Sequence, residues 1–499
     1  MKRLLAALVL ALSLAGTATV AQAAPGLEAT FQDDNQLIYV KPGERNAHLD
    51  SLKALGVDRL RVTILWRAIA PSPSSRTRPR FDATDPAAYP SGTWSNYDAL
   101  VREAYARGLK VNFNLTGPSP LWANKRPPRP DIADNYEPSP SEFAQFVAAV
   151  GRRYSGTYSD RSGGILPRVD YWSIWNEPNH SGWLTPTWQK VDGRFVERSA
   201  SLYRELLDGA YAALKLVGHG SDTILFGDTA PSGWNSKDVK RFMKPLTFLR
   251  ALYCVDGSLH RLKGAAARRL NCPANARDFV TAHPALFKAT GYAHHPYQLL
   301  TAPDVKPSDK DFVTMAVLSR LTHTLDTVQR RYGSHRRFPI YLTEFGYQTP
   351  PDPAGVPLSY QAAFINEAEY IAYHNPRVRT LSQFLLVDSG APIHTTFQSG
   401  LVTRSGRRKP AFAAYRVPIW VRGKGSRKRV WALLRPAAPG ARATGIVQFR
   451  PAKSARWRTV RRVRSRGASN VITTTVTIRG KGSVRVAYGR LHSRGARVG

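Results

Sequence analysis

The stretch VDYWSIWNEP, residues 169–178, decides the fold, because a buried strand and a polar turn meet in it. An apolar, aromatic-rich run leads directly into Asn176, Glu177 and a proline, which is the pattern of a central strand followed by a loop. The stretch PIYLTEFGY, residues 339–347, repeats this arrangement around Glu344. Because the carboxyl ends of parallel strands meet at one edge of a sheet, we expect Glu177 and Glu344 to lie together.

Six further strand-like runs alternate with helical patterns around these two. The runs begin near residues 27, 59, 110, 223, 289 and 380, and amphipathic stretches cover 141–154, 197–214, 312–332 and 360–374. Eight strand–helix pairs predict an α/β fold, the closed (β/α)8 TIM barrel. An open doubly wound sheet is not favoured, because no G-x-G-x-x-G follows the first strand. We assign residues 24–416 to the barrel.

The pattern changes after residue 416 to short alternating strands without helices. These strands are expected at 429–437, 444–452, 456–465, 470–478 and 483–489, separated by Gly, Pro and Ser turns. They predict a small, basic antiparallel β-sandwich domain from residue 417 to 490. Residues 491–499 are expected to form a disordered tail.

The first 23 residues have the features of a secretory signal peptide. Lys2 and Arg3 precede an apolar run up to about Leu14, and Ala21 and Ala23 supply small residues for cleavage. A transmembrane helix is the alternative, but this run is shorter than the roughly 20 residues that a bilayer requires. We therefore expect a secreted protein, either extracellular or associated with the cell envelope.

The chain contains two cysteines, Cys254 and Cys272. In an oxidising compartment their simplest use is a disulfide that closes one loop, and two buried, unpaired thiols are the alternative. Neither cysteine has partners at metal-ligand spacing, so we expect no Cys-based metal site.

Positive charge is concentrated at the C-terminal end of the chain. The net charge is +37, and residues 401–499 contain 26 of the 72 lysines and arginines but none of the 35 acidic residues. Such a domain predicts contact with an anionic polymer or a cell-envelope surface, although solubility alone could explain the composition. Nucleic-acid binding is not expected, because the chain has no recognisable motif for it and carries an export signal.

Two carboxyl groups at one barrel mouth indicate glycoside hydrolysis with retention of configuration. One group protonates the leaving oxygen while the other attacks the anomeric carbon, and the two lie about 5 Å apart. A glutamate that ends a strand can also simply be solvated, and Glu344 alone does not distinguish these cases. The Trp-Asn-Glu-Pro run at residues 175–178 is far more specific.

Together the two motifs resemble clan A of the glycoside hydrolases, especially families 39 and 5 of the cellulase/β-xylosidase superfamily. The resemblance implies that Glu177 is the general acid/base and that Glu344 is the nucleophile. It also implies that Asn176 hydrogen-bonds the sugar 2-hydroxyl and that Arg61 keeps the nucleophile ionised and oriented. Arg59 competes for the arginine role but lies further from the C-terminal end of its strand.

The run HHPY, residues 294–297, is similar to the clan's His-x-Tyr pair. The similarity implies that Tyr297 hydrogen-bonds the nucleophile and that His295 lines the site. His294 is the alternative to His295, because only one of two adjacent histidines can point inward. Flat aromatic faces match the C–H faces of sugars, so tryptophans near the strand ends are further substrate-binding candidates. Trp66 and Trp122 stand in contexts similar to family 39 and family 5 loops, and Trp183 lies in the loop after Glu177. Each tryptophan could instead pack under a loop.

The sequence also departs from the clan pattern. The clan usually has a tryptophan at the end of the eighth strand, whereas SQFLLVD at residues 382–388 has none. The third strand carries Asn112 and Asn114 where family 5 enzymes often have a histidine, which favours family 39. The platform under the sugar is therefore expected to be altered, and the substrate is left unassigned.

The expected function is secreted retaining hydrolysis of O-glycosidic bonds in a polysaccharide or oligosaccharide, without a metal or an organic cofactor. Because the acid must begin the cycle protonated, we expect burial and the charge of Glu344 to raise the pKa of Glu177. A transglycosidase and a catalytically silent carbohydrate-binding or wall-associated barrel are the alternatives. The presence of Arg61, Asn176, Tyr297 and both glutamates favours an enzyme over the silent barrel.

Overall fold

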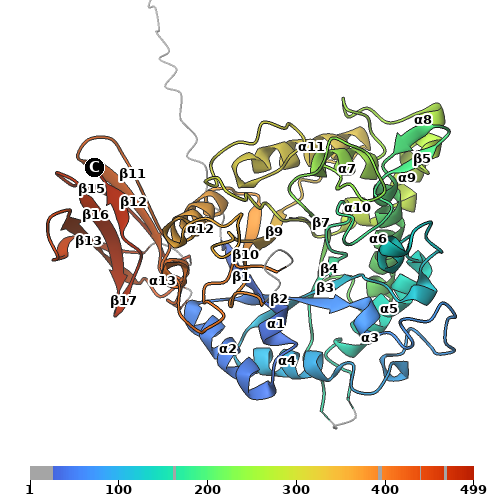
Figure 1. The fold of residues 1–499 in the computed structure, drawn as a ribbon, viewed down its shortest axis with the longest axis horizontal. Coiled ribbons are helices and arrows are strands. Elements are labelled where there is room, and N and C mark those ends of the chain that lie inside the picture. Colours follow the sequence, from blue (N-terminus) through green and yellow to red (C-terminus); the bar gives the residue numbers. More distant parts are fainter. Residues whose placement is uncertain (1–25, 161–163, 391–395, 439, 466–468) are drawn as a thin grey trace, which may run out of the picture.

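The computed structural model describes residues 26–160, 164–390, 396–438, 440–465 and 469–499. The signal peptide expected at residues 1–23 lies outside this part of the chain. Figure 1 shows two regions, a barrel surrounded by helices and a smaller all-β region beside α12 (Leu358–Tyr373) and α13 (Pro410–Arg416). Among the described helices, none combines the length and apolarity needed to cross a membrane.

The eight strands expected from the sequence form one closed parallel barrel, which confirms the TIM-barrel prediction. Neighbours in the barrel follow the chain order, and the first and last strands pair through Glu28 and Thr380 to close it. Apolar side chains fill the layer between these strands and the surrounding helices. The strands are β1 (Glu28–Gln32), β2 (Arg59–Leu65), β3 (Lys110–Thr116), β4 (Tyr171–Ile174), β7 (Thr223–Thr229), β8 (Gly291–His294), β9 (Ile340–Phe345) and β10 (Val378–Phe384).

The helices of the barrel begin where local sequence signals place them. In α5 (Pro140–Arg153) the Ser139 hydroxyl accepts from the amide of Glu142, and a proline occupies the first helical position. The helix expected at 312–332 begins only at Leu318, because Met315–Val317 form a 3-10 turn before α11 (Leu318–Arg331). Other helices around the barrel are α2 (Pro42–Leu55), α4 (Ser95–Ala106) and α6 (Arg198–Leu216).

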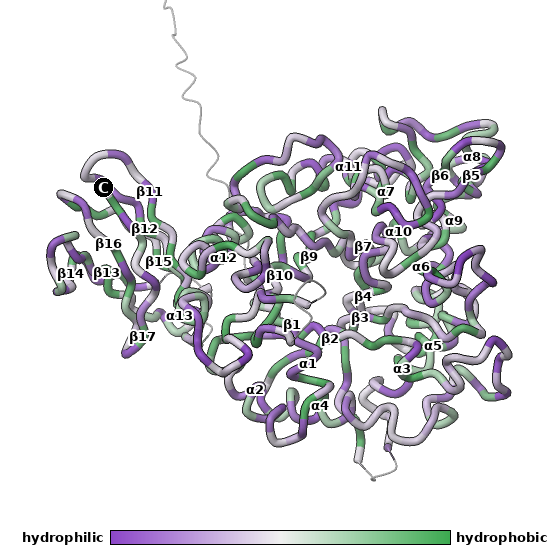
Figure 2. Tube along the Cα trace, viewed as in Figure 1, coloured by the Kyte–Doolittle hydropathy of each residue, from purple (hydrophilic) through white to green (hydrophobic). Residues whose placement is uncertain are grey.

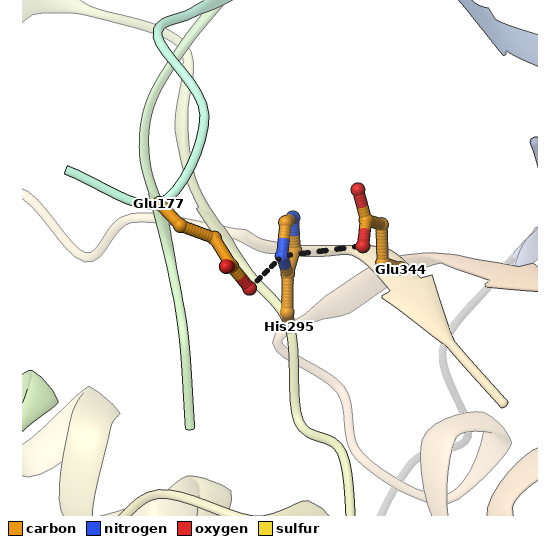
Figure 3. Close-up of side chains that lie close together, drawn as sticks. All are labelled: Glu177, His295 and Glu344. Atoms are coloured by element: carbon orange, nitrogen blue, oxygen red, sulfur yellow. Dashed lines mark hydrogen bonds and ion pairs between the residues drawn. The ribbon is translucent and has the colours of Figure 1, made fainter. Parts of the chain in front are cut away.

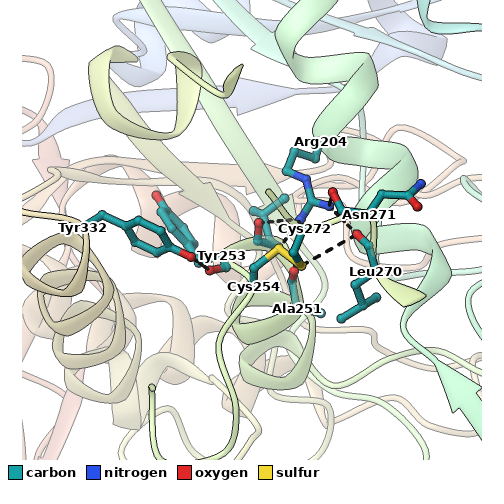
Figure 4. Close-up of a disulfide and its surroundings, with 9 residues drawn as sticks. Arg204, Ala251, Tyr253, Cys254, Leu270, Asn271, Cys272 and Tyr332 are labelled. Atoms are coloured by element: carbon teal, nitrogen blue, oxygen red, sulfur yellow. Dashed lines mark hydrogen bonds between the residues drawn. A yellow bond between two sulfur atoms is a disulfide. The ribbon is translucent and has the colours of Figure 1, made fainter. Parts of the chain in front are cut away.

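The long segment between β7 and β8 contains four short helices and a disulfide. Cys254 and Cys272 are bonded to each other, as expected from the sequence. The buried Arg204 guanidinium donates to the carbonyls of Leu252 and Leu270 on either side of this bond (Figure 4). The helices are α7 (Pro245–Leu252), α8 (Gly264–Arg269), α9 (Ala276–Ala282) and α10 (Ala285–Lys288).

The C-terminal region is a sandwich of two antiparallel sheets. One sheet has the order β11 (Ile419–Arg422), β12 (Arg427–Leu433) and β15 (Val471–Thr477). The other contains β14 (Arg458–Arg464), β13 (Thr444–Pro451), β16 (Gly482–Tyr488), β17 (Leu491–His492) and β18 (Ala496–Val498). Val430 from the first sheet and Val447 and Val484 from the second are fully buried in one core. The five expected strands are present, and β11 is an additional one.

The prediction of a disordered tail at residues 491–499 is wrong. Both β17 and β18 pair with β16, and Ala496 and Val498 are buried against the sandwich. The Arg494 side chain donates to Asn366 of α12. A second contact to the same helix is the buried ion pair between Arg435 and Glu369, whose atoms are 2.7 Å apart. The sandwich therefore extends to the C-terminal end of the described chain and packs against the barrel.

Candidate active site

Glu177 and Glu344 lie at the same mouth of the barrel. Glu344 belongs to β9, while Glu177 follows β4 in a turn where Trp175 and Glu177 have φ values of 66° and 37°. Such left-handed conformations are costly for residues with a Cβ atom, and strain of this kind is concentrated at functional sites. The turn brings a carboxylate oxygen of Glu177 within 4.8 Å of one from Glu344. This separation suits two carboxyl groups that act on one bond.

Arg61 is fully buried in β2 and holds the nucleophile candidate. Its Nη1 donates to Oε1 of Glu344 at 2.6 Å, and its Nη2 donates to Oδ1 of Asn176 at 2.7 Å. Arg59 instead donates to Glu28 and to the carbonyl of Val111, away from both glutamates. Of the two arginines considered from the sequence, Arg61 is the one that contacts the site. Asn176 also lines the cleft above the barrel.

His295 lies between the two glutamates, as Figure 3 shows. Its Nδ1 is 2.9 Å from Oε1 of Glu177 and 3.6 Å from Oε2 of Glu344. His294 points elsewhere and bonds Thr229 and the carbonyl of Val313. The structure thus brings His295, and not its neighbour, to the carboxylates.

Tyr297 completes the contacts to Glu344. Its hydroxyl donates to Oε2 of Glu344 at 3.0 Å, while Arg61 occupies the other oxygen. Burial, together with the charge of Glu344, raises the pKa of Tyr297 well above its ordinary value, so its hydroxyl stays protonated and remains a donor. The two donors fix the orientation of the Glu344 carboxylate from both sides.

Asp228, near the end of β7, also belongs to the site and was not predicted from the sequence. Its carboxylate is fully buried and lies 3.6 Å from Nη2 of Arg61 and 3.3 Å from Nε2 of His295. It also accepts from the hydroxyl of Thr343 and, at 3.2 Å, from Asn114. The signal that could have found it is the pattern shared with the two glutamates, a carboxylate directly before a turn at a strand end.

Charge interactions within this cluster control where its protons lie. Burial alone would lower the pKa of His295, but the charge of Glu344 and the contacts to Asp228 and Glu177 raise it to about 9. Burial raises the pKa of Asp228, but Arg61 and His295 outweigh this effect and lower it to about 2. His295 is therefore an imidazolium at neutral pH, surrounded by carboxylates.

The expected rise in the pKa of Glu177 is wrong for this arrangement. Burial does raise the pKa, but the hydrogen bond and the positive charge of His295 together lower it below its ordinary value. The prediction failed because it considered burial and Glu344 without a cation beside Glu177. In the resting site the proton of the Glu177–His295 pair lies on the imidazole.

A cleft of about 810 Å³ opens above the carboxylates. Of the three tryptophans expected around it, only Trp183 lines it. Trp66 is buried and stacks on Phe146 in the layer between strands and helices, so its expected place in the cleft is wrong. Trp122 packs edge-on against Trp66 and donates to the carbonyl of Pro71, also outside the cleft.

Other residues that line the cleft were not anticipated. Phe384 ends β10 and packs edge-on against Phe397, so this pair supplies the aromatic surface at the strand end that has no tryptophan. Two polar residues also line the cleft, Gln32 at the end of β1 and Asp34 at the start of α1 (Asp34–Leu37). Asp34 accepts from the amide of Thr63 at 3.0 Å, and burial raises its pKa.

Comparison with solved structures gives the fold independent support. No family model matches the sequence, and neither does any curated protein. A family 39 glycoside hydrolase from the gut symbiont Bacteroides cellulosilyticus WH2 superposes with a TM-score of 0.50 at 12% identity, covering 91% of this chain and 81% of that one. A glucosidase from Croceicoccus marinus gives a TM-score of 0.49 at 12% identity, with 92% and 96% covered. At this identity the likeness shows the fold alone, a TIM barrel that this chain shares with the family 39 glycoside hydrolase.

Proposed function

We propose that this protein is a retaining glycoside hydrolase that acts by double displacement. The observation that carries the proposal is the pair of carboxylates within 4.8 Å of each other in an open cleft. Inverting enzymes need a wider gap, roughly 6.5–9.5 Å, because a water molecule must fit between the sugar and the base. A separation of 4.8 Å leaves no room for that water, so direct attack by one carboxylate is favoured.

Glu344 is the nucleophile in this mechanism. Arg61 and Tyr297 each donate to one of its oxygens, which orients the carboxylate. One oxygen attacks the anomeric carbon, forming a glycosyl ester as the bond to the leaving oxygen breaks. Asn176 lines the cleft beside Glu177, where it can bond a sugar hydroxyl in the transition state.

Glu177 supplies the proton together with His295. The pair holds one proton across a 2.9 Å hydrogen bond, and this proton passes through Glu177 to the leaving oxygen. Formation of the ester removes the charge of Glu344 and with it the strongest influence that raises the pKa of His295. In the second step Glu177 takes a proton from water, which attacks the ester and releases the sugar with retained configuration.

Export, with action on a glycan outside the cell, is part of the same proposal and rests on the leader sequence. The alternatives to a hydrolase differ from it in what happens to the glycosyl ester. A transglycosidase would pass the sugar to another hydroxyl, and a silent binding protein would not form the ester. The complete arrangement of donors around Glu344 favours an enzyme, because a binding protein needs no oriented nucleophile.

Site-directed variants test this proposal. Glu344→Ala should abolish turnover of aryl glycosides, and azide should restore part of it as a glycosyl azide of inverted configuration. Glu177→Ala should still react with substrates that have good leaving groups, and azide should accelerate its slow second step. Identical behaviour of the two variants on an activated substrate would contradict the division of roles.

We also propose that the sandwich binds an anionic polymer through the outer face of its five-stranded sheet. Val447, Val484 and Val486 point into the core, so alternation along the strands turns their neighbours outward. The outward residues include four arginines, namely Arg450, Arg462, Arg485 and Arg497. The hydropathy colours in Figure 2 are mostly hydrophilic along β14, whereas β13 alternates between hydrophobic and hydrophilic residues.

This arginine face has no acidic partner of its own. Within the described residues, the sandwich forms ion pairs only with acids of the barrel, from Arg422 to Asp304 and from Arg435 to Glu369. The guanidinium of Arg485 lies 4.2 Å from the ring centre of Trp457, and that of Arg450 lies 5.0 Å away. Like charges held this close favour a polyanion as partner.

A further inference from the structure

The cleft is unusually rich in exposed apolar side chains. Of the twelve large hydrophobic side chains that are exposed in the described part of the chain, five line this one cleft. Leu299 and Leu300 are the most prominent, with 68% and 58% of their surface exposed. The others are Tyr39, Val305 and Phe397. Isolated exposed hydrophobics are normal, but their concentration in a cleft indicates a ligand with an apolar part.

The loop that carries these leucines is held in place by its own hydrogen bonds. The buried side chain of Gln298 donates to the carbonyls of Ala302 and Val305 at 2.8 and 2.6 Å. From outside the loop, Tyr347 donates to the carbonyl of Thr301 at 2.8 Å. Leu299 and Leu300 therefore stand at fixed positions in solvent, so the apolar surface is formed before a ligand arrives.

The apolar wall continues on the neighbouring loops. Pro307 and Phe312 line the cleft from the same connection between β8 and α11, and Phe242 lines it from the connection between β7 and β8. Phe242 in turn packs on His180, which lies three residues after Glu177. The apolar wall thus reaches the side of the cleft where the acid/base candidate is located.

The sugar whose bond is cleaved binds at the polar end of the same cleft, beside the two glutamates. Its hydroxyls require hydrogen-bond partners, and Gln32, Asp34 and Asn176 line the cleft together with the two glutamates. Leu299, Leu300 and Val305 offer no such partner through their side chains. The apolar wall is therefore suited to the group on the other side of the scissile bond, the aglycone.

We propose that the substrate is an amphiphilic glycoside, in which a sugar is joined to an extended apolar aglycone such as an alkyl chain. This inference rests on the proposed glycosidase function and narrows its substrate class from a polysaccharide to a lipid-like glycoside. A cellulose-type chain would place a hydroxyl-rich sugar against the leucines. An alkyl chain buries its methylene groups there, each worth about a threefold to fourfold gain in binding.

The test compares methyl, butyl and octyl glycosides of whichever sugar the wild-type enzyme releases from aryl glycosides. We expect kcat/KM to rise at least tenfold from methyl to octyl. The double variant Leu299→Ser with Leu300→Ser should lose most of that rise and keep wild-type activity on the methyl glycoside. Leu216→Ser is the matched control, because Leu216 is 81% exposed on α6 and does not line the cleft. No dependence on chain length, or equal effects of control and double variant, would overturn the proposal.

A direct binding measurement separates failure of this inference from failure of the glycosidase assignment. The apolar dye N-phenyl-1-naphthylamine should fluoresce on binding to the wild-type protein and to Glu344→Gln, and octyl glucoside should displace it. The leucine double variant should bind at least fivefold more weakly. Dye binding without turnover of any glycoside would contradict the glycosidase proposal alone. Turnover of a glycoside without dye binding would contradict the apolar subsite alone. The same conclusion would follow if the leucine variants changed only the oligomeric state, as measured by size-exclusion chromatography.

Discussion

Nδ1 of His295 lies 2.9 Å from Oε1 of Glu177, and this contact sets the protonation state of the candidate acid. The imidazolium lowers the pKa of the carboxyl group that must donate a proton. Because of this contact, Glu177 and His295 share one proton. The pair loses that proton at the raised pKa of His295.

The first prediction concerns the pH profile of kcat/KM. The wild-type enzyme should lose activity above about pH 9, where the His295–Glu177 pair loses its proton. In His295→Asn the proton must reside on Glu177 alone, and the alkaline limb should move down by at least two pH units. A stopped assay on one aryl glycoside across the pH range measures this shift. An alkaline limb at the same pH in both proteins would contradict the shared proton.

Asp228 gives a prediction about stability. Its pKa is lowered to about 2 in the folded protein, so its contribution to stability is present above the unfolded pKa near 4 and is lost as the pH falls through about 2. Asp228→Asn removes a buried partner of Arg61 and His295, and should cost about 3 kcal/mol at pH 7. Urea unfolding at a series of pH values should show this difference shrinking below pH 4. A constant difference would indicate that the charge of Asp228 is not what matters.

The disulfide gives a third prediction. It closes a loop between residues 18 apart, and loops of this size contribute about 3 kcal/mol. Cys254→Ala with Cys272→Ala should therefore melt several degrees lower, and reduction of the wild-type protein should produce a similar change. Neither cysteine lines the cleft, so kcat at 25 °C should stay at the wild-type value. Loss of kcat with an unchanged melting temperature would contradict this structural role.

The arginine face of the sandwich gives a fourth prediction. Arg462→Glu with Arg497→Glu reverses two exposed charges on that face, and should lower the salt concentration needed to elute the protein from heparin. The control Lys424→Glu with Arg427→Glu makes the same net change, with Arg427 on the other sheet and Lys424 in the turn that leads into its strand. If both pairs of changes shifted elution equally, net charge and not the arginine face would explain retention.

The barrel could be predicted because its information is local and repeated. Each strand combines an apolar run and a turn within about ten residues. Glu177 lies in the turn after β4, and Glu344 lies near the end of β9. Asp228 has the same local context, but its role depends on Arg61 and His295, which are distant in sequence. A pattern that covers one strand cannot show such pairings.

The errors came from features that only tertiary packing decides. Trp66 directly follows β2, yet it begins a short helix, α3 (Trp66–Ile69), that turns the ring into the layer around the barrel. The last nine residues are too short and too polar to indicate strands, and they become ordered by pairing with β16. Phe384 ends the eighth barrel strand and lines the cleft, where the clan pattern predicts a tryptophan.

The nucleophile assignment is tested most directly by trapping the covalent intermediate. The wild-type enzyme would be treated with a panel of 2-deoxy-2-fluoro glycosides carrying good leaving groups, digested, and analysed by mass spectrometry. The account predicts one fluoroglycosyl adduct, on Glu344, together with loss of activity that recovers as the ester slowly hydrolyses. An adduct on another residue would contradict it, and so would turnover of an aryl glycoside with inversion of configuration at the anomeric carbon.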